Sequence, residues 1–280
     1  SALATAARLG TTADDTWLAC LPLSHVGGLS VITRALHTGA NLVIHEGFDA
    51  SEVQAAARNG ATAVSLVSTA LARIDPTLFR VIVLGGSRPP AVRPAHSVAT
   101  YGLTETGSGV VYDGVPLDGV EVRIVDHEVQ LRCPMQLRAY RDGTTPVDSD
   151  GWLHTNDSGE LTPDGRLIVH GRRGDMIVTG GENVWPDAVE HALADVPGVA
   201  AVAVAGAPDA EWGQRVVAWV IPAADGDAPT LADLRSHVGE SLPMFCAPKE
   251  LRLVESLPRT ALGKVQRHVL VQSPNESDSH

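Results

Sequence analysis

The chain has 280 residues, of which 44% are hydrophobic and 19% are charged. This composition is typical of one large or two ordinary globular domains and excludes a disordered or fibrous chain. The sequence has no run of 18 apolar residues, so we expect no membrane span. It has 33 acidic and 21 basic residues, which gives a net charge of −12. We therefore do not expect the protein to bind nucleic acid over its whole surface. The net charge does not exclude a local basic pocket that binds an anion.

Short apolar segments alternate with short helical segments through the first hundred residues. Residues 1–9 are rich in alanine and are typical of the end of a helix. Apolar strands that alternate with helices predict a parallel α/β sheet. The expected strands cover residues 17–23, 41–45, 63–67, 80–84 and 97–100, and the expected helices cover 51–59 and 68–74.

The pattern changes near Gly119. Short strands separated by turns predict a small antiparallel β subdomain, with strands over 120–125, 129–132, 159–161 and 167–170. A glycine-rich stretch, Gly171–Gly181, follows. The segments beyond it predict a compact α+β unit, with helices over 186–193 and 231–242 and strands over 199–206, 216–222 and 250–254.

The change of pattern predicts two domains in an α/β fold. We expect a large domain over residues 1–171, a hinge over 172–175, and an α+β domain over 176–272 that can move as a lid. The polar end of the chain, residues 273–280, is expected to be a disordered tail.

The cysteines and lysines are few. Cys20, Cys133 and Cys246 lie far apart in the sequence with no CxxC pair, so we expect no disulfide framework and a reducing cytoplasmic location. The histidines show no HExxH motif, which makes a zinc site unexpected. Lys249 and Lys264 are the two lysines beside 19 arginines, so each of them is of interest.

The segment Tyr101–Gly107, YGLTETG, carries the clearest chemistry. It follows an expected strand and holds two threonines and one glutamate between glycines. Ligands in open α/β sheets bind beyond the carboxyl ends of strands. A carboxylate there, Glu105, could hold Mg²⁺ beside a phosphate, because Mg²⁺ prefers a few protein oxygens plus phosphate oxygens. The alternative is an ordinary polar turn.

Three further charged residues lie in glycine- or proline-framed segments. Asp157 in HTNDSGEL could accept both hydroxyls of a ribose, or simply form a turn. Arg172 in GRRGD could bind ribose or phosphate oxygens, or form a surface ion pair. Lys264 in PRTALGKVQR could contact a carboxylate and a phosphate at once, or be a solvated lysine.

Five segments together resemble the adenylate-forming acyl-CoA synthetase superfamily, in the order that family shows. They are LPLSHVGG (21–28), YGLTETG (101–107), HTNDSGEL (154–161), GRRGDMIVTGGENVWPDAVE (171–190) and PRTALGKVQR (258–267). The segment YDGVPLDGVEVRI (112–124) is most similar to that of bacterial o-succinylbenzoate–CoA ligases of menaquinone biosynthesis. Aryl- and fatty-acyl-CoA ligases share the same frame and remain the alternative.

The resemblance implies an AMP-forming acid–thiol ligase that uses ATP, Mg²⁺ and coenzyme A. In such enzymes a carboxylate attacks the α-phosphate of ATP, which gives an acyl-adenylate and pyrophosphate. The small domain then rotates, and the thiol of coenzyme A displaces AMP. The partners implied are a small carboxylic acid, ATP and coenzyme A, and a homo-oligomer stays open.

Family roles carry over onto residues of the large domain. Glu105 would hold Mg²⁺ and Thr104 would contact the α-phosphate, while Tyr101 would stack on adenine beside Gly102. The segment Gly85, Gly86 and Ser87 would line the adenine and acyl pocket. His25 would lie by the acyl carboxylate, although its apolar surroundings also fit a core histidine.

The remaining roles fall on the later motifs. Asp157 and Arg172 would hold the ribose, and Lys264 would bridge the carboxylate and the α-phosphate during adenylation. Gly174 and Asp175 would belong to the hinge, where the family usually carries a charge at the position of Gly174. Glycine is permissive there instead. Gly180 and Gly181 would flank the pantetheine tunnel.

The chain departs from the family in one large feature. The Ser/Thr/Gly-rich phosphate loop that ends in lysine is not found before the first helix, so the resemblance implies an N-terminally incomplete large domain. A non-catalytic remnant that binds AMP, an acyl-adenylate or acyl-CoA is therefore the second hypothesis. If the acid is o-succinylbenzoate, Arg88 and Arg93 are candidates for its second carboxylate.

Overall fold

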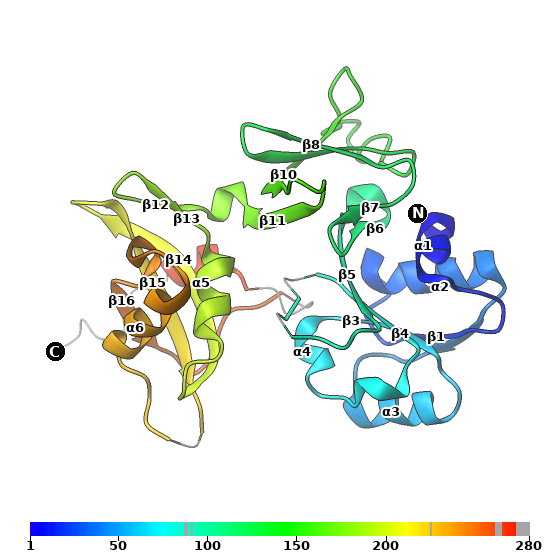
Figure 1. The fold of residues 1–280 in the computed structure, drawn as a ribbon, viewed down its shortest axis with the longest axis horizontal. Coiled ribbons are helices and arrows are strands. Elements are labelled where there is room, and N and C mark those ends of the chain that lie inside the picture. The colour runs from blue at the N-terminus through cyan, green and yellow to red at the C-terminus, as the bar shows by residue number, and fades with distance from the viewer. Residues whose placement is uncertain (87–88, 91, 225, 261–264, 273–280) are drawn as a thin grey trace. The chain divides into compact units, whose positions relative to one another are not determined.

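The structure is a computed structural model that describes residues 1–86, 89–90, 92–224, 226–260 and 265–272. The chain divides into two compact units (Figure 1). The first comprises Ser1–Thr155 with Gly159–Ile168, and the second comprises Asn156–Ser158 with the chain from Val169 onward. The expected borders at 171, 172–175 and 176–272 stay predictions, and the expected tail lies outside the described residues.

A seven-stranded sheet forms the centre of the first unit, in the order β2-β1-β3-β4-β5-β6-β7. Neighbouring strands are parallel as far as β5 and antiparallel from β5 to β7. The predicted parallel α/β sheet is thus confirmed. The strands are β1 (Thr16–Ala19), β2 (Asn41–Ile44), β3 (Ala63–Leu66), β4 (Val81–Leu84), β5 (Ser97–Leu103), β6 (Ser108–Tyr112) and β7 (Val115–Pro116).

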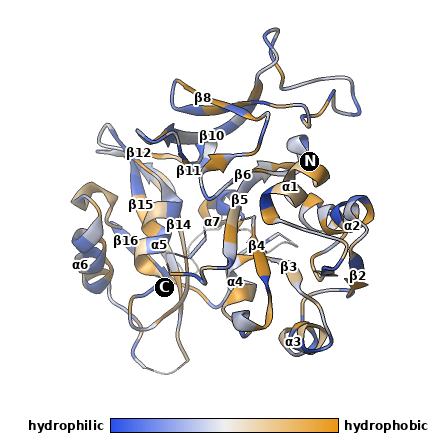
Figure 2. Ribbon diagram, turned by 45° about the vertical axis from the view of Figure 1, so that its right-hand side comes forward, coloured by the Kyte–Doolittle hydropathy of each residue, from blue (hydrophilic) through white to orange (hydrophobic). Residues whose placement is uncertain are grey.

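The central strands β3 and β4 are apolar apart from Ser65, because both of their faces are covered. Every residue of β3 and of β4 is buried, and β4 is coloured as hydrophobic in Figure 2. One face packs on α3 (Ala50–Arg58) and α4 (Ser68–Leu71) through a core that includes Val53, Leu71 and Ile82. Asp49 begins α3 by accepting hydrogen bonds from the N–H groups of residues 51 and 52.

Two further helices pack on this sheet. They are α1 (Ala2–Leu9), at the predicted position, and α2 (Val26–Thr38), for which the sequence patterns predict no helix. The buried Arg34 of α2 lies over the ring of Trp17 in β1, 4.3 Å from the ring centroid, and its Nη2 donates to Ser65 Oγ. This contact places α2 on the sheet.

A four-stranded antiparallel sheet follows in the order β11-β10-β9-β8. Its strands are β8 (Glu121–Val125), β9 (Glu128–Arg132), β10 (Leu153–Leu161) and β11 (Leu167–Arg172), so the predicted β subdomain is confirmed. Asp126 and His127 join β8 to β9 with φ of 48° and 64°, values that suit a tight hairpin turn. Strand β10 is longer than predicted and contains Asn156 at φ 57°.

The second unit is built on a five-stranded sheet. Its order is β13-β12-β15-β14, with β16 also paired to β15. The long antiparallel pair is formed by β14 (Val199–Asp209) and β15 (Gly213–Pro222), which contain the two predicted strands and extend beyond them. The remaining elements are β12 (Ile177–Thr179), β13 (Glu182–Val184), β16 (Glu250–Leu253), α5 (Pro186–Leu193), α6 (Leu231–Ser241) and α7 (Arg267–Gln272).

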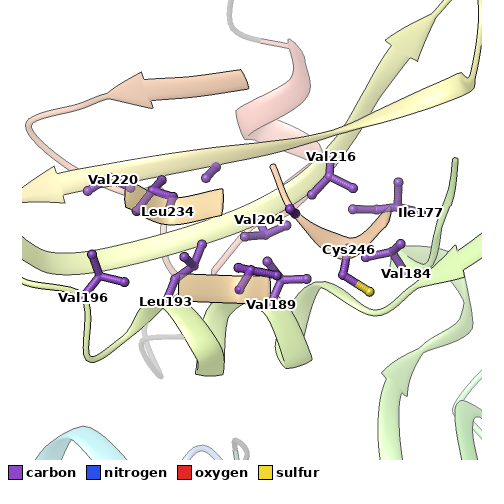
Figure 3. Close-up of a cluster of buried hydrophobic side chains, with 13 residues drawn as sticks. Ile177, Val184, Val189, Leu193, Val196, Val204, Val216, Val220, Leu234 and Cys246 are labelled. Carbon is purple, nitrogen blue, oxygen red and sulfur yellow. The ribbon is translucent and has the colours of Figure 1, made fainter. Parts of the chain in front are cut away.

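Separate cores form on the two faces of this sheet. Figure 3 shows the core between the strands and the two helices α5 and α6, where Val189 and Leu193 meet Val204 and Leu234. The opposite face packs on α7 through Leu270. Across the part of the chain that the structure describes, no helix combines the length and the apolar character that crossing a membrane requires.

Candidate functional site

Several of the predicted site residues follow parallel strands of the first sheet at their carboxyl ends. His25 comes after β1, Gly85–Gly86 after β4, and Thr104–Glu105 after β5. Because β1, β3, β4 and β5 run parallel, their carboxyl ends share one edge of the sheet. This edge is where open α/β sheets bind ligands.

Gly85 and Gly86 lie beside the strand that leads into YGLTETG. A Cβ atom at Gly85 would lie 3.2 Å from Thr100 Oγ1, and that hydroxyl donates to the Leu84 carbonyl at 3.0 Å. Gly86 has φ 79°, a conformation that favours glycine. The structure thus places Gly85 beside Thr100, the residue that directly precedes the motif. Ser87 and Arg88 lie outside the described residues.

Gly102 is required by the close approach of two backbones. A Cβ atom there would lie 2.2 Å from the Ser108 carbonyl oxygen, in a bulged part of the β5–β6 hairpin. Thr106 is fully buried, and its hydroxyl accepts from the Leu103 N–H at 2.9 Å and lies 2.8 Å from the Ser108 oxygen. Gly102 and Thr106 therefore build the turn, which presents the exposed Thr104.

Glu105 is half-buried in the 3₁₀ turn Thr104–Thr106. Its Oε1 accepts a hydrogen bond from the hydroxyl of Tyr140 at 2.8 Å. Its main-chain carbonyl accepts from the N–H of Leu137 at 2.6 Å. The loop between β9 and β10 therefore contacts both the side chain and the backbone of the predicted Mg²⁺ ligand.

His25 stands at the start of α2 and is half-buried. Its carbonyl accepts from the N–H groups of Gly28 and Leu29, and its side chain makes no capping hydrogen bond to the helix. Gly28 is required here, because a Cβ atom would lie 2.4 Å from the Pro22 oxygen. His25 is therefore a residue of the strand-to-helix junction and not a fully buried core histidine.

Arg93 is engaged away from the carboxyl edge. Its guanidinium forms hydrogen bonds to the Asp113 carboxylate and to the carbonyl of Ser97. Ser97 is the first residue of β5, so this arginine lies at the opposite end of the strand from Glu105. The structure gives Arg93 a structural partner instead of the role expected for it.

The two residues predicted to hold a ribose are neighbours in the second unit. Asp157 Oδ1 lies 2.9 Å from Arg172 Nε. The Asp157 side chain is only 7% exposed, whereas that of Arg172 is 43% exposed. The structure thus joins β10 and β11 by an ion pair at this point.

The predicted hinge, residues 172–175, contains a short 3₁₀ turn over Arg173–Asp175. Gly174 has no left-handed φ, so its conformation does not require glycine. Asp175 accepts a hydrogen bond from Arg267 Nη1 at 3.1 Å. Arg267 is the last residue of the PRTALGKVQR segment and has no predicted role.

Arg267 connects α7 to three carboxylates. Its side chain is 11% exposed, and besides Asp175 it contacts the carboxylate of Asp187 and, at 2.8 Å, Glu190 Oε2. Glu190 Oε1 also accepts from the Val204 N–H at 2.8 Å. Burial raises the pKa of Glu190 to about 7, although Arg267 and the Val204 N–H oppose this shift.

Gly180 and Gly181 form the turn between β12 and β13, with φ of 60° and 86°. A Cβ atom at Gly180 would lie 2.5 Å from the ring of Trp212. Lys249 Nζ lies 3.4 Å from the centroid of the same ring, and this buried nitrogen makes no hydrogen bond with the described residues. An ammonium and an aromatic ring thus adjoin the predicted pantetheine glycines.

Lys264, the predicted adenylation residue, lies outside the described residues. Three residues with close contacts to predicted site residues were not assigned from sequence: Tyr140, Arg267 and Trp212. For Lys249 the rarity of lysine was a signal, but nothing in the sequence linked it to Gly180.

Comparison with protein families gives two matches. Residues 1–137 match the AMP-binding enzyme family, and residues 188–264 match the AMP-binding enzyme C-terminal domain. A relative from Mycobacterium tuberculosis (strain CDC 1551 / Oshkosh), named "Probable 2-succinylbenzoate--CoA ligase", is 38% identical over 298 residues. This alignment covers 97% of the chain and 77% of the relative.

Solved structures give the same result. The o-succinylbenzoate CoA synthetase from Bacillus subtilis, in complex with its acyl-adenylate intermediate, matches with a TM-score of 0.87 and 29% identity over 98% of this chain and 64% of that one. The same synthetase in complex with ATP and magnesium ion matches with a TM-score of 0.84 and 30% identity over 95% of this chain and 63% of that one. The chain thus spans less than two thirds of these solved proteins. By sequence identity, coverage and fold, the chain belongs to the family of AMP-binding, adenylate-forming enzymes.

Proposed function

We propose that the protein containing this chain is an ATP-dependent acid–CoA ligase of menaquinone biosynthesis, with o-succinylbenzoate as its acid. It joins the acid to AMP with release of pyrophosphate, and then transfers the acyl group to the thiol of coenzyme A with release of AMP. The family membership and the names of the relatives support this activity.

One observation carries the proposal. Gly85 at the end of β4 lies against Thr100, the residue directly before YGLTETG, and the turn that follows presents Thr104 and Glu105 at the carboxyl edge of the sheet. This edge therefore carries the glycine backbone, the hydroxyl of Thr104 and the carboxylate of Glu105. A nucleotide triphosphate with its cation requires groups of these kinds.

Glu105 has the chemistry expected of a Mg²⁺ ligand. Among the described residues no cluster of three or more His, Cys, Asp or Glu side chains could hold a metal. Mg²⁺ typically binds one or two carboxylates together with substrate phosphates. When bound, the ion would supply positive charge to the triphosphate, while the hydroxyl of Thr104 would donate a hydrogen bond to an oxygen of the α-phosphate.

Asp157 and Arg172 supply the ribose contacts in this proposal. Asp157 is buried and held by Arg172, so its carboxylate has a defined direction before a nucleotide binds. A preorganised acceptor loses less entropy on binding than a mobile one does. Lys264 would complete the adenylation site by contacting the carboxylate that attacks the α-phosphate.

Coenzyme A would be bound by the turn at Gly180–Gly181. Without side chains this turn allows the pantetheine arm to approach the backbone, and Lys249 places a positive charge near it. Coenzyme A is a polyanion, so an ammonium here favours its binding. We also propose that the second unit rotates about residues 172–175 between the two half-reactions, a change for which hinge closure is the usual device.

We further propose a cytoplasmic location. Cys20, Cys133 and Cys246 are all free and buried, and burial raises the pKa of the Cys20 thiol to about 11. Free thiols persist in a reducing compartment.

A panel of acids tests the proposal. The encoded protein that contains this chain is incubated with ATP, Mg²⁺, coenzyme A and one acid at a time, and AMP release and thioester are measured. We expect turnover with o-succinylbenzoate. Turnover of benzoates or long fatty acids without o-succinylbenzoate would favour the aryl- or fatty-acyl-CoA ligases, and tight AMP binding without any turnover would favour the non-catalytic remnant.

A further inference from the structure

The hydroxyl of Tyr140 and the carboxylate of Glu105 form a side-chain contact that the reaction scheme above does not use. We propose that Tyr140 is a positioning residue, which fixes the carboxylate of Glu105 in the orientation that receives the divalent cation. The inference rests on the proposed function, since it assumes that Glu105 holds the cation.

The contact is direct and is supported from the same loop. Tyr140 Oη donates to Glu105 Oε1 at 2.8 Å. Three residues earlier, the N–H of Leu137 donates to the Glu105 carbonyl at 2.6 Å. One short segment therefore holds both the backbone and the carboxylate of Glu105, which limits the rotamers that this side chain can adopt.

The loop is anchored independently of Glu105. The N–H of Tyr140 donates to the Thr144 carbonyl at 2.8 Å, and Asp142 Oδ1 accepts from the N–H and the hydroxyl of Thr144. On the other side, Gln136 Nε2 donates to the Gly151 carbonyl at 3.1 Å. The backbone of Tyr140 is thus held at the start of a closed turn, and its exposed side chain reaches Glu105 from that fixed position.

The chemistry of the donor matters as much as its position. A phenol is neutral at pH 7, so its hydrogen bond orients the carboxylate without cancelling its charge. An arginine or lysine at the same place would compete with the cation. Among the ion pairs formed by the described residues, none includes Glu105, so the full negative charge of Glu105 remains for a dication.

A group that orients a metal ligand has a measurable signature. Removing such an outer hydrogen bond typically lowers metal affinity or activity by about 10- to 100-fold. The loss should appear in the cation concentration that the reaction needs, and saturating cation should restore the rate. A merely structural tyrosine would lower stability and would not shift the cation dependence.

The test compares Tyr140→Phe with the wild type in the encoded protein. Binding of Mn²⁺ in the presence of ATP is measured by electron paramagnetic resonance, and the Mg²⁺ dependence of adenylation is measured by ATP–pyrophosphate exchange. We expect Mn²⁺ affinity to fall by about tenfold, with the exchange rate recovering at high Mg²⁺. Tyr112→Phe is the matched control, because it removes a hydroxyl bonded to Thr5, and it should leave Mn²⁺ affinity unchanged.

A double-mutant cycle with Glu105→Gln decides between positioning and general destabilisation. If Tyr140 acts through Glu105, Tyr140→Phe causes no further loss of Mn²⁺ affinity in the Glu105→Gln background. Additive losses, or unchanged Mn²⁺ affinity in Tyr140→Phe, would overturn the proposal. Binding of Mn²⁺ in the presence of ATP is measured without acid or coenzyme A. If the protein makes no thioester, the proposed function is wrong, but the Mn²⁺ affinity still tests the role of Tyr140.

Discussion

Asp157 and Arg172, 15 positions apart in the sequence, form an ion pair with 2.9 Å between Oδ1 and Nε. The carboxylate is almost fully buried, and the guanidinium is more exposed. This arrangement holds the carboxylate in one direction while Arg172 remains accessible to a ligand.

Asp157→Asn should weaken AMP binding by about tenfold or more, since a hydrogen bond to a charged group contributes about 1.5–3 kcal/mol. Titration calorimetry with AMP measures the change. Asp164→Asn is the control, because Asp164 also pairs with a nearby arginine, Arg166, but on an exposed turn. Equal AMP affinity in wild type and Asp157→Asn would contradict the ribose assignment.

Lys264→Ala should slow adenylation by about two to three orders of magnitude, the scale of one charged transition-state contact. An ammonium can follow a carboxylate oxygen as that oxygen bonds to phosphorus, so the loss should appear in the rate more than in substrate binding. Supplied acyl-adenylate and coenzyme A should still give thioester at nearly the wild-type rate. A parallel fall in both half-reactions, measured separately, would show that the lysine has a structural role.

Lys249→Met should affect thioester formation with coenzyme A and not adenylation. Methionine is an unbranched apolar side chain of similar length, and it removes the positive charge that lies over Trp212. The KM for coenzyme A should therefore rise, while ATP–pyrophosphate exchange stays unchanged, and Lys249→Arg should retain most of the affinity. Steady-state kinetics with coenzyme A as the varied substrate measures this, and an unchanged KM would remove Lys249 from the coenzyme A site.

Glu190 predicts a pH dependence of stability. Its pKa is about 7 in the folded protein against an ordinary value of 4.5, so between these pH values the unfolded chain is ionised while the folded one keeps its proton. Glu190 thus makes its full contribution to the free energy of unfolding below pH 4.5, and this contribution is lost as the pH rises to 7. Over this window it amounts to roughly 3 kcal/mol.

Glu190→Gln is neutral at every pH and removes this term. The Tm of the wild type relative to Glu190→Gln should therefore fall as the pH is raised from 4.5 to 7, as measured by thermal unfolding. If the two proteins show parallel Tm profiles, Glu190 is ionised throughout and Arg267 outweighs the effect of burial.

Much of the fold follows from local signals. Helix α5 begins at Pro186 and ends at Leu193 as predicted, because proline at the first helical position marks a start. Helix α2 was not predicted, since Gly27 and Gly28 weaken its pattern. The need for Gly28, the approach of the Pro22 carbonyl, exists only in the folded chain.

The candidate site divides in the same way. The carboxyl-edge position of Glu105 could be predicted, because a motif that follows a parallel strand must lie at that edge. Its contact with Tyr140, 35 positions away, and the contact of Asp175 with Arg267, 92 positions away, depend on how loops close. No spacing or periodicity in one sequence carries that information.

Transfer of oxygen from the acid to AMP is the most direct test of the proposed acyl-adenylate intermediate. The encoded protein is given o-succinylbenzoate labelled with ¹⁸O in its carboxylates, together with ATP, Mg²⁺ and coenzyme A, and the nucleotide product is analysed by mass spectrometry. A carboxylate oxygen that attacks the α-phosphorus leaves with AMP when the thiol displaces it. We expect AMP carrying one ¹⁸O for each thioester formed. Formation of ADP with ¹⁸O in inorganic phosphate, or of AMP without label, would rule out attack of the acid on the α-phosphate.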